Sequence, residues 1–443
     1  MITPKTLHPH ALSKRLGQGL LALGLSIGSW AQTTEPAALS PSVSHSMSPS
    51  MSHTMNHSTS PSPNTNNLAC TSQEIDCANA ATPWFLSDDT LLLVWTAAGS
   101  VMVASSKDMG KTFSPSTELA HHGQLLDTGS DARAQIVGDE HSRVLIAYSF
   151  FKDKNWNAQI NFLRSADAGA HFSAPQALIK NGMSERFPSL GMDQGGRVYV
   201  SWVDKRWVQQ QRAKSIKKLG GSIAMSYTDD WAESFHGEKI VNTESCECCR
   251  IAMDVSQSSM PVIAYRALFD QGIRDHAVQT FKVMEKTQEL QASAIHPVAN
   301  DRWQTDVCPH HGPSVTVSSQ KTIHTVWFTQ GQIRKGLFYA RSDDGGQHFS
   351  APLTIGDLNA NESRPYILAT GADVWMVWKR FDGVQSRVMV RHSVDDGLHW
   401  SEAQIVAQTS GYSDHPLLIK HQEKAYLSWL TRNEGFRLIE LKG

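Results

Sequence analysis

Two short segments of the sequence are rich in cysteine and histidine, the residue types that hold soft metal ions. CECCR covers residues 246–250, and CPHHG covers residues 308–312. Thiolate and imidazole together favour copper or zinc over magnesium or calcium. The spacing matches no standard zinc module, and no Cys-x-x-Cys-His haem attachment sequence is present. If the fold brings the segments together, the candidate ligands are Cys246, Cys248, Cys249, Cys308, His310 and His311.

The N-terminal segment has the pattern of a secretory signal. Residues 1–31 contain the basic residues Lys5, Lys14 and Arg15, then the apolar run LLALGLSIG, then small residues up to Ala31 where a signal peptidase would cut. The run is short for a membrane span of roughly twenty residues. We therefore expect a periplasmic or secreted protein without a membrane span. The net charge of -2 argues against a nucleic-acid partner.

Residues 32–68 are rich in Ser, Pro, Thr and Asn, and contain too few apolar residues to form a core. We expect a disordered tether. Its imidazole and thioether groups suit copper, although a solvated linker without ligands is the alternative. With the Cys/His segments, they favour copper as the metal and another exported metal-handling protein as a partner. The candidate ligands in the tether are His45, Met47, Met51, His53, Met55 and His57.

Disulfide bonding is the competing interpretation of the cysteines. The chain has six cysteines, and exported proteins occupy compartments in which thiols oxidise. Cys70 and Cys77 are expected to pair with each other. Cys308 would then pair with Cys248 or Cys249, which leaves an adjacent thiol unpaired. Metal ligation and disulfide bonding both remain open.

A short hydrophobic pattern recurs seven times and indicates the fold. Repeats of roughly fifty to sixty residues with several short strands favour a radial β architecture over a single sheet. We expect residues 69–443 to form an all-β propeller of four-stranded blades, with seven blades favoured and six as the alternative. The last repeat has about three strands, and a strand near residues 68–77 would complete it. The copies end at Trp95, Tyr148, Trp202, Tyr265, Trp327, Trp378 and Trp429.

Four repeats carry a second pattern, of which Ser342-Asp-Asp344-Gly-Gly346-Gln-His-Phe349 is an example. Ser and Asp side chains bond the backbone inside a tight turn, and Gly adopts a positive φ. The pattern resembles the Asp box of the sialidase superfamily, also called BNR repeat proteins, over about residues 82–430. The resemblance implies turns on the side away from the ligand site. The four copies begin at Ser106, Ser165, Ser342 and Ser393, and a degenerate copy spans Ser226 to Trp231.

Each repeat begins with a lead-in segment that precedes its innermost strand. In a propeller these segments converge near the central axis, so residues distant in sequence become neighbours and form a funnel. The two Cys/His segments fall at the fourth and fifth lead-in segments, on neighbouring blades. The funnel is expected to bind a small anionic ligand through Arg133, Arg186, Arg250, Arg364 and His415. The lead-in segments are residues 82–84, 132–134, 186–188, 249–251, 311–313, 364–366 and 415–417.

If the resemblance extends to activity, the chain would be an exo-sialidase. The resemblance then implies Tyr412 as the nucleophile, Glu362 or Glu185 as its assistant, and Asp131 as the acid/base. Arginines would grip a sugar carboxylate with their planar forks. The chain departs from the family at residues 81–85, which read ATPWF where a Phe/Tyr-Arg-Ile-Pro segment is expected. The Cys/His segments have no role in that mechanism.

The sequence therefore predicts an exported, sialidase-like propeller that binds copper or zinc, or a small ligand, at its funnel without hydrolysis. An exo-sialidase is one alternative. A partner-binding propeller without chemistry is another, because a fold does not determine a function.

Overall fold

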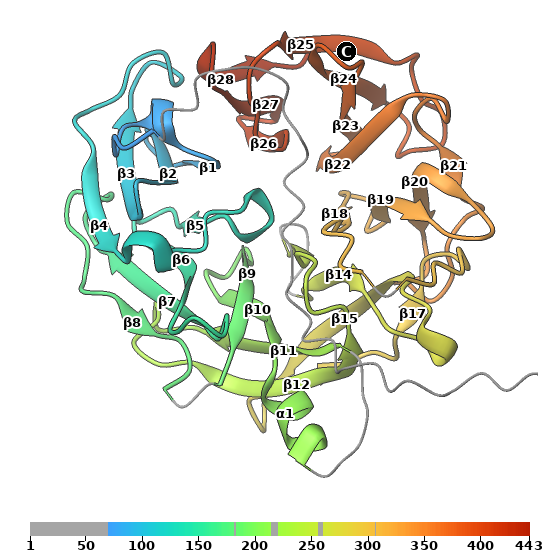
Figure 1. Cartoon of the computed structure of the whole chain (residues 1–443), viewed down its shortest axis with the longest axis horizontal. Helices are drawn as coiled ribbons and strands as arrows, with labels where there is room; N and C mark the ends of the chain where they lie inside the picture. The colour runs from blue at the N-terminus through green and yellow to red at the C-terminus, as the bar shows by residue number, and fades with distance from the viewer. Residues whose placement is uncertain (1–69, 181–182, 214–219, 256–259, 306) are drawn as a thin grey trace, which may run out of the picture. The chain divides into compact units, whose positions relative to one another are not determined.

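Seven antiparallel sheets are arranged radially in this chain, as Figure 1 shows. The computed structural model describes residues 70–443 except 181–182, 214–219, 256–259 and 306. The expected all-β propeller is confirmed, with seven blades and not six. The expected signal peptide (1–31) and tether (32–68) lie outside the described residues. Within the described part, no helix is both long enough and apolar enough to cross a bilayer.

Strands that follow one another in the sequence are neighbours in each blade, from the innermost strand to the rim. The first three blades have four strands each. Their strands are β1 (Ala81–Phe85), β2 (Leu91–Ala97), β3 (Ser100–Ser106) and β4 (Thr117–His121); β5 (Gln135–Gly138), β6 (Val144–Phe151), β7 (Ala158–Ser165) and β8 (Gln176–Ala177); β9 (Glu185–Met192), β10 (Val198–Asp204), β11 (Gly221–Thr228) and β12 (His236–Ser245).

The fourth blade divides its outer strand, because β16 and β17 both pair with β15. The fifth and sixth blades have four strands, and the seventh has three. These blades contain β13 (Ala252–Asp254), β14 (Val262–Arg266), β15 (His276–Met284), β16 (Glu289–Ala292) and β17 (His296–Pro297); β18 (Ser314–Val317), β19 (Ile323–Gln330), β20 (Lys335–Ser342) and β21 (Leu353–Thr354); β22 (Asn361–Thr370), β23 (Asp373–Phe381), β24 (Ser386–Ser393) and β25 (Gln404–Thr409); β26 (Leu417–His421), β27 (Lys424–Thr431) and β28 (Gly435–Glu440).

Helices occur only in connections of the described chain. The α-helix α1 (Arg206–Ala213) follows β10. The 3₁₀ helices are η1 (Ile75–Cys77), η2 (Gly123–Leu125), η3 (Ser130–Ala132) and η4 (Asp270–Gly272). The short helix η3 matters for function because it carries Asp131 into the second lead-in segment.

The ring closes between the seventh and first blades. Each innermost strand contacts the innermost strand of the next blade, and β26 contacts β1. The expected strand near residues 68–77 is wrong for the described part of that segment, which contains η1, so the seventh blade keeps three strands. Helix η1 contacts both β28 and β2 and fills the joint between the two blades.

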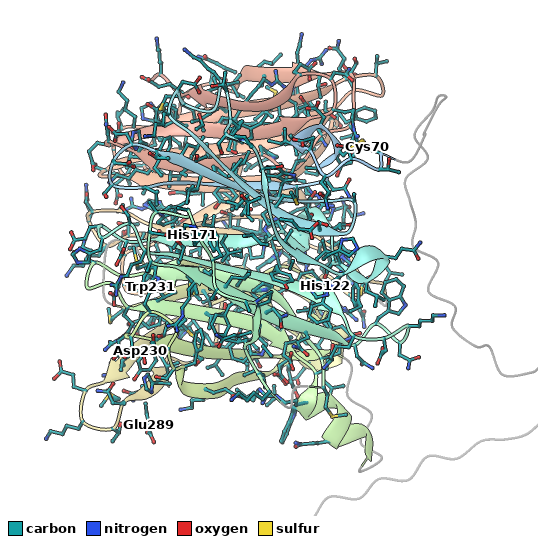
Figure 2. All side chains as sticks on the ribbon, turned by 90° about the vertical axis from the view of Figure 1, so that its left-hand side faces the viewer. Cys70, His122, His171, Asp230, Trp231 and Glu289 are labelled. Atoms are coloured by element: carbon teal, nitrogen blue, oxygen red, sulfur yellow. A yellow bond between two sulfur atoms is a disulfide. The ribbon has the colours of Figure 1, made fainter. Side chains whose placement is uncertain are left out.

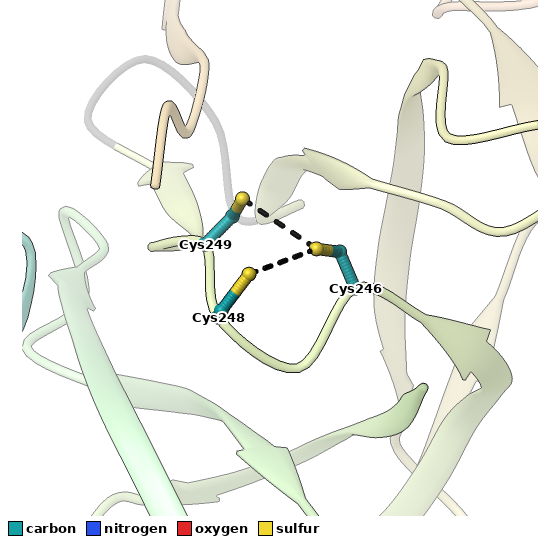
Figure 3. A group of neighbouring side chains, drawn as sticks. All are labelled: Cys246, Cys248 and Cys249. Carbon is teal, nitrogen blue, oxygen red and sulfur yellow. Dashed lines mark hydrogen bonds between the residues drawn. The ribbon is translucent and has the colours of Figure 1, made fainter. Parts of the chain in front are cut away.

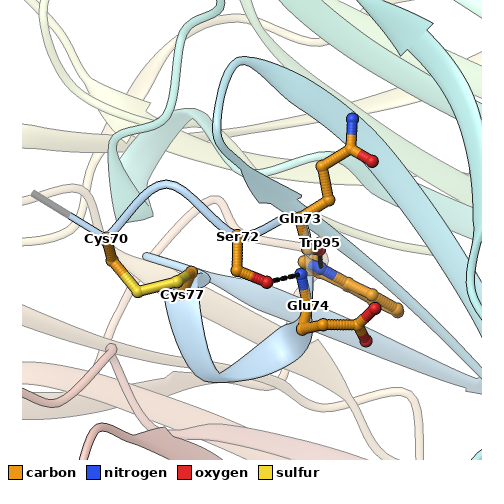
Figure 4. Close-up of a disulfide and its surroundings, with 6 residues drawn as sticks. All are labelled: Cys70, Ser72, Gln73, Glu74, Cys77 and Trp95. Atoms are coloured by element: carbon orange, nitrogen blue, oxygen red, sulfur yellow. Dashed lines mark hydrogen bonds between the residues drawn. A yellow bond between two sulfur atoms is a disulfide. The ribbon is translucent and has the colours of Figure 1, made fainter.

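The expected Cys70–Cys77 disulfide is present and explains why this segment is not a strand (Figure 4). Its Cα atoms are 5.4 Å apart, whereas seven extended residues span roughly 23 Å. The indole Nε1 of Trp95 donates a hydrogen bond of 2.9 Å to the Gln73 carbonyl and holds the loop on the first blade.

The aromatic residues that end the seven hydrophobic patterns form the core between blades. Each lies on the second strand of its blade and is between 0% and 3% exposed. In one cluster, Leu427 and Trp429 of β27 pack with Trp375 and Val377 of β23. Aromatic and β-branched residues suit a pleated surface, and packing sheet against sheet removes apolar area from water on both blades.

The four Ser/Asp turns share one hydrogen-bond pattern. Ser106 Oγ accepts a bond of 2.9 Å from Gly110 N and donates one of 2.8 Å to Asp108 Oδ1. The copies that begin at Ser165, Ser342 and Ser393 repeat both bonds.

The degenerate copy begins two residues later than expected, at Thr228 and not Ser226. Ala232 N donates to Thr228 Oγ1 at 2.8 Å, so threonine takes the place of the serine and alanine that of the glycine.

The strand register places these turns and the lead-in segments at opposite ends of each blade. Ala81 at the start of β1 pairs with Trp95 near the end of β2, whereas Leu91 at the start of β2 pairs with Ser106. Figure 2 shows His171 and Asp230 of two turns on one side, and Cys70 and His122 on the other. The side with the lead-in segments is called the lead-in face below.

Replacing Gly346 with alanine should destabilise the propeller. Gly346 has φ +87°, and an added β carbon would lie 3.3 Å from Val278 Cγ1. An alanine in this left-handed conformation costs about 1–2 kcal/mol, so the free energy of unfolding in urea should fall by about that amount. Gly129 has φ -66° and ψ 143°, which alanine adopts freely, so Gly129→Ala is the control and should leave the midpoint unchanged. Equal effects of the two changes would contradict the turn assignment.

Candidate metal centre and funnel

The two Cys/His segments lie on neighbouring blades and touch each other. The first follows β12 and precedes β13, and the second follows β17 and precedes β18. A β carbon on Gly312 would lie 2.5 Å from the Arg250 carbonyl oxygen. Only glycine permits so close a contact, so the two segments are neighbours as the propeller geometry predicts.

Cys246, Cys248 and Cys249 form a compact group, called the inner triad (Figure 3). Cys246 Sγ lies 3.3 Å from Cys248 Sγ and 3.6 Å from Cys249 Sγ. A disulfide holds its sulfurs about 2.05 Å apart, while two thiolates bound tetrahedrally to one zinc ion lie about 3.8 Å apart. All three side chains are buried. Both separations are too long for a disulfide and somewhat shorter than the spacing of two ligands on zinc, so a small outward shift of the sulfurs would allow them to share an ion.

A second group, called the outer triad, consists of Cys248, Cys308 and His310, whose ligand atoms all lie within 4.8 Å of one another. Cys248 belongs to both triads. Cys308 is exposed and His310 is half-buried, so the outer triad is open to solvent. The structure leaves Cys246, Cys248, Cys249 and Cys308 as free thiols, and the bridge from Cys308 to Cys248 or Cys249 that was the alternative is not formed.

His311 belongs to neither triad. Its ring stacks on Phe328 with centroids 4.3 Å apart, and its Nδ1 is buried without a hydrogen-bond partner. The ring lines a separate cavity of about 280 Å³ between the fifth and sixth blades. Burial, with the charge of Arg364 next in effect, lowers the pKa of His311 well below its usual value.

Two arginines surround the inner triad with positive charge. Arg274 Nη1 lies 3.4 Å from Cys246 Sγ. Arg266 is 1% exposed and donates to the carbonyl oxygens of Arg274, His311 and Phe328. Hydrogen bonds from Cys248 and Cys249 lower the pKa of Cys246 well below its usual value, and the charge of Arg266 acts in the same direction. Hydrogen bonding to Cys246 raises the pKa of Cys248 and of Cys249, so Cys246 is the member of the inner triad whose thiolate form these contacts favour.

The funnel is a cavity of about 130 Å³ lined by residues from all seven lead-in segments. Arg133 makes a buried, bidentate ion pair with Asp414, with N–O distances of 2.7 and 3.0 Å. Asp131 accepts from Arg250 at 3.2 Å and from Arg364 at 3.0 Å.

His415 Nδ1 lies 3.7 Å from Asp131 Oδ1. Burial, followed by the charges of Arg364, Arg133 and Arg250, lowers the pKa of His415 well below its usual value. Burial and the surrounding cations therefore both favour the neutral form of this imidazole.

Lys379 adds a fourth cation beside the funnel. Its Nζ donates to the Ser413 carbonyl at 3.1 Å. Burial lowers the pKa of Lys379 to about 8, against the opposing charge of Asp414. Three arginines and this lysine face two carboxylates, so the funnel carries a positive excess that suits an anion.

Arg186 lies outside the funnel lining. Its Nε donates to Asp127 Oδ2 at 2.5 Å, and its guanidinium stacks on Phe187, 4.3 Å from the ring centroid. Of the five expected ring residues, the structure brings Arg133, Arg250, Arg364 and His415 together and leaves Arg186 apart.

Two residues of the sialidase alternative, Tyr412 and Glu362, are engaged with other groups. The Tyr412 hydroxyl donates to the Asn79 carbonyl at 3.2 Å. Glu362 accepts from Arg380 at 2.6 Å and from Asp357 N at 2.8 Å.

The two remaining carboxylates of that alternative differ in their surroundings. Glu185 is fully buried, and burial raises its pKa to about 7. Asp131 lies between Arg250 and Arg364. Because its carboxylate already forms ion pairs with two arginines, Asp131 is poorly placed to donate a proton.

Sequence reasoning missed four charged residues that shape these sites: Arg266, Arg274, Lys379 and Asp414. A signal for two of them was present, because Arg266 and Lys379 directly follow the aromatic residue that ends the hydrophobic pattern. The second strand of each blade runs toward the lead-in face, so a charged residue at its end reaches the same region as the lead-in segments.

Mild oxidation should join Cys248 to Cys308 across the two blades. In a Cys246→Ser, Cys249→Ser protein, diamide should produce an intramolecular disulfide between the two remaining neighbours, because their sulfurs lie within 4.8 Å. Peptide mapping by mass spectrometry detects the link. Cys308→Ser in the same background is the control and should give none. A failure of the link to form in folded protein would contradict the proximity of the segments.

No family model and no curated protein matches the chain. Among solved structures, a polysaccharide lyase described as an ulvan lyase, bound to a -[GlcA(1-4)Rha3S]- saccharide, matches with a TM-score of 0.52 at 10% identity, over 82% of this chain and 94% of that chain. The polysaccharide lyase Uly1 matches with a TM-score of 0.51 at 10% identity, over 82% and 90%. An intramolecular trans-sialidase from Ruminococcus gnavus matches with a TM-score of 0.41 at 11% identity, over 82% and 94%. The matches to the two lyases support the expected β-propeller fold, and the fold alone.

Proposed function

We propose that this protein binds copper as Cu(I) at the inner triad and does not hydrolyse glycosides. The observation that carries the proposal is the group of three buried cysteine sulfurs, with separations of 3.3 and 3.6 Å from Cys246 Sγ. Buried thiols at this spacing, unbridged by a disulfide, have the arrangement of ligands around a soft ion.

The number of ligands favours copper over zinc. Structural zinc sites are almost always four-coordinate, but the inner triad supplies three sulfurs, and the outer groups do not lie within reach of all three. Soft thiolate ligands select Cu(I), which accepts three of them. Charge supports the same choice, because three thiolates and one Cu(I) leave two negative charges, and Arg266 and Arg274 supply two positive charges beside them.

The proposal includes the N-terminal region and the compartment. A periplasmic or secreted protein meets copper outside the cytoplasm, and the imidazole and thioether groups at residues 45–57 would capture the ion. Thioethers bind Cu(I) less tightly than thiolates, so the ion would pass from that region to the inner triad. Another exported metal-handling protein would supply or receive it.

The reduced full chain should retain copper against a competing chelator, and Cys249→Ser should abolish this retention. The experiment is anaerobic dialysis of Cu(I)-loaded protein against bicinchoninate, followed by metal analysis and a free-thiol count. We expect affinity to fall by more than about 100-fold, because even the loss of a group that only orients a metal ligand costs about 10- to 100-fold. His311→Gln is the matched control and should retain copper. Wild-type protein that retains zinc but not copper, or no metal at all, would overturn the proposal.

A second candidate function rests on the positive excess in the funnel, which favours an anionic ligand such as an acidic saccharide. The exo-sialidase alternative belongs here. Because Asp131 and Glu362 are already paired with arginines, we expect no turnover of a fluorogenic sialoside.

The sialoside assay also includes Tyr412→Phe, which should give the same background rate as the wild type. Turnover by the wild type that disappears in Tyr412→Phe would support the sialidase and reverse this ranking.

A further inference from the structure

The outer triad is a second set of soft ligands that the inner triad does not use. Cys308 comes from the fifth lead-in loop and Cys248 from the fourth, and His310 completes the set. The inner triad is buried, whereas Cys308 is exposed. The two triads therefore form a path from solvent to the interior, with Cys248 at the junction.

One ion cannot use all five ligand atoms of the two triads. Two thiolates on one ion are at most about 4.6 Å apart, which is twice a metal–sulfur bond of about 2.3 Å. The ligand atoms of each triad lie within 4.8 Å of one another, but the five together do not satisfy that limit. A single ion therefore occupies one triad or the other and leaves the remaining ligands free.

Cys248 can serve two ions because a thiolate sulfur has several lone pairs. Its Sγ lies 3.3 Å from Cys246 Sγ on the buried side and within 4.8 Å of Cys308 and His310 on the open side. Bridging thiolates are a common feature of soft-metal chemistry. No other residue of the two triads lies in both groups, so the bridge has one possible position among the described residues.

We propose that the outer triad binds a second Cu(I), bridged to the first by Cys248, and that it is the exchange site through which copper enters and leaves the inner triad. This proposal rests on the proposed function. An ion arriving at Cys308 and His310 would bind Cys248 before it leaves its donor. It would then exchange those two ligands for Cys246 and Cys249 while it remains bound to Cys248. Each step breaks one metal–ligand bond as another forms, and the oxidation state does not change.

The positive charge of the site supports this direction of travel. Arg274 Nη1 is in direct contact with Cys246 Sγ, whereas it acts on Cys308 only through its charge, so the buried end compensates thiolate charge best. The outer triad contains one imidazole in place of a third thiol, and its Cys308 is exposed, which suits weaker and faster binding. The predicted order is a labile outer ion and a retained inner ion.

The test is an anaerobic Cu(I) titration of the reduced full chain in competition with bicinchoninate. Thiolate-to-copper absorption in the ultraviolet counts ions on cysteine and excludes those on the N-terminal thioethers. We expect two ions for the wild type, and X-ray absorption should show a copper neighbour for each copper. Cys308→Ser and His310→Gln should each reduce the count to one. The remaining ion should still resist the chelator, but it should load at least tenfold more slowly.

His311→Gln is the matched control, since its ring lies next to these residues but in neither triad, and it should keep two ions and the wild-type loading rate. If Cys308→Ser does not fold, as judged by circular dichroism, His310→Gln decides the matter alone. Wild-type protein that binds one ion, or a His310→Gln protein that still binds two, would overturn this inference and leave the inner site intact. Wild-type protein that binds no copper would instead overturn the proposed function.

Discussion

The antiparallel register of the blades is the constraint on which the sites depend. Each innermost strand starts on the same face, so each lead-in segment must emerge there. The sequential contact of the innermost strands, from β1 round to β26 and back to β1, fixes which segments are neighbours. Residues 248 and 308 therefore meet although the whole fourth blade separates them in the sequence. No local interaction within either segment could achieve this.

Burial of ionisable groups on the lead-in face requires compensating charge, and the two sites solve this in opposite ways. In the funnel, cations are in excess, and Asp131 and Asp414 neutralise only part of their charge. At the inner triad, sulfur supplies the negative charge and Arg274 the positive charge. The guanidinium of Arg274 stays charged under all ordinary conditions, which explains why it can support a thiolate in a buried position. The same principle of paired burial places a cluster with excess positive charge and a cluster of buried sulfur atoms on one face.

The sequence predicted the fold well because its signals repeat. Seven aromatic-ended patterns and four Ser/Asp turns each report the same local structure, so the errors are confined to unique segments. The prediction of a strand after Cys70 was wrong because a short disulfide loop competes with strand formation. The predicted first residue of the degenerate turn was wrong because Thr228 and Ala232 replace the usual serine and glycine.

The candidate sites were predictable only as far as the ring geometry determines them. The proximity of the two Cys/His segments followed from blade order. Blade order did not predict that His311 lies outside both triads, because its position depends on the stacking of its ring on Phe328. Arg186 likewise turns toward Asp127. Side-chain direction at a loop depends on individual packing partners, and a sequence pattern does not identify those partners.

The location of the outer triad on two different blades has a mechanical consequence. Cys248 follows β12 and Cys308 follows β17, so an ion bound by both would cross-link the segments that lead into the fourth and fifth blades. A ligand that binds only the folded state adds RT ln(1 + L/Kd) to its stability, where L is the free ligand concentration. The rigidity of the cross-linked segments would then report the copper supply, and a binding partner that touches both blades could distinguish the loaded protein from the empty one by shape alone.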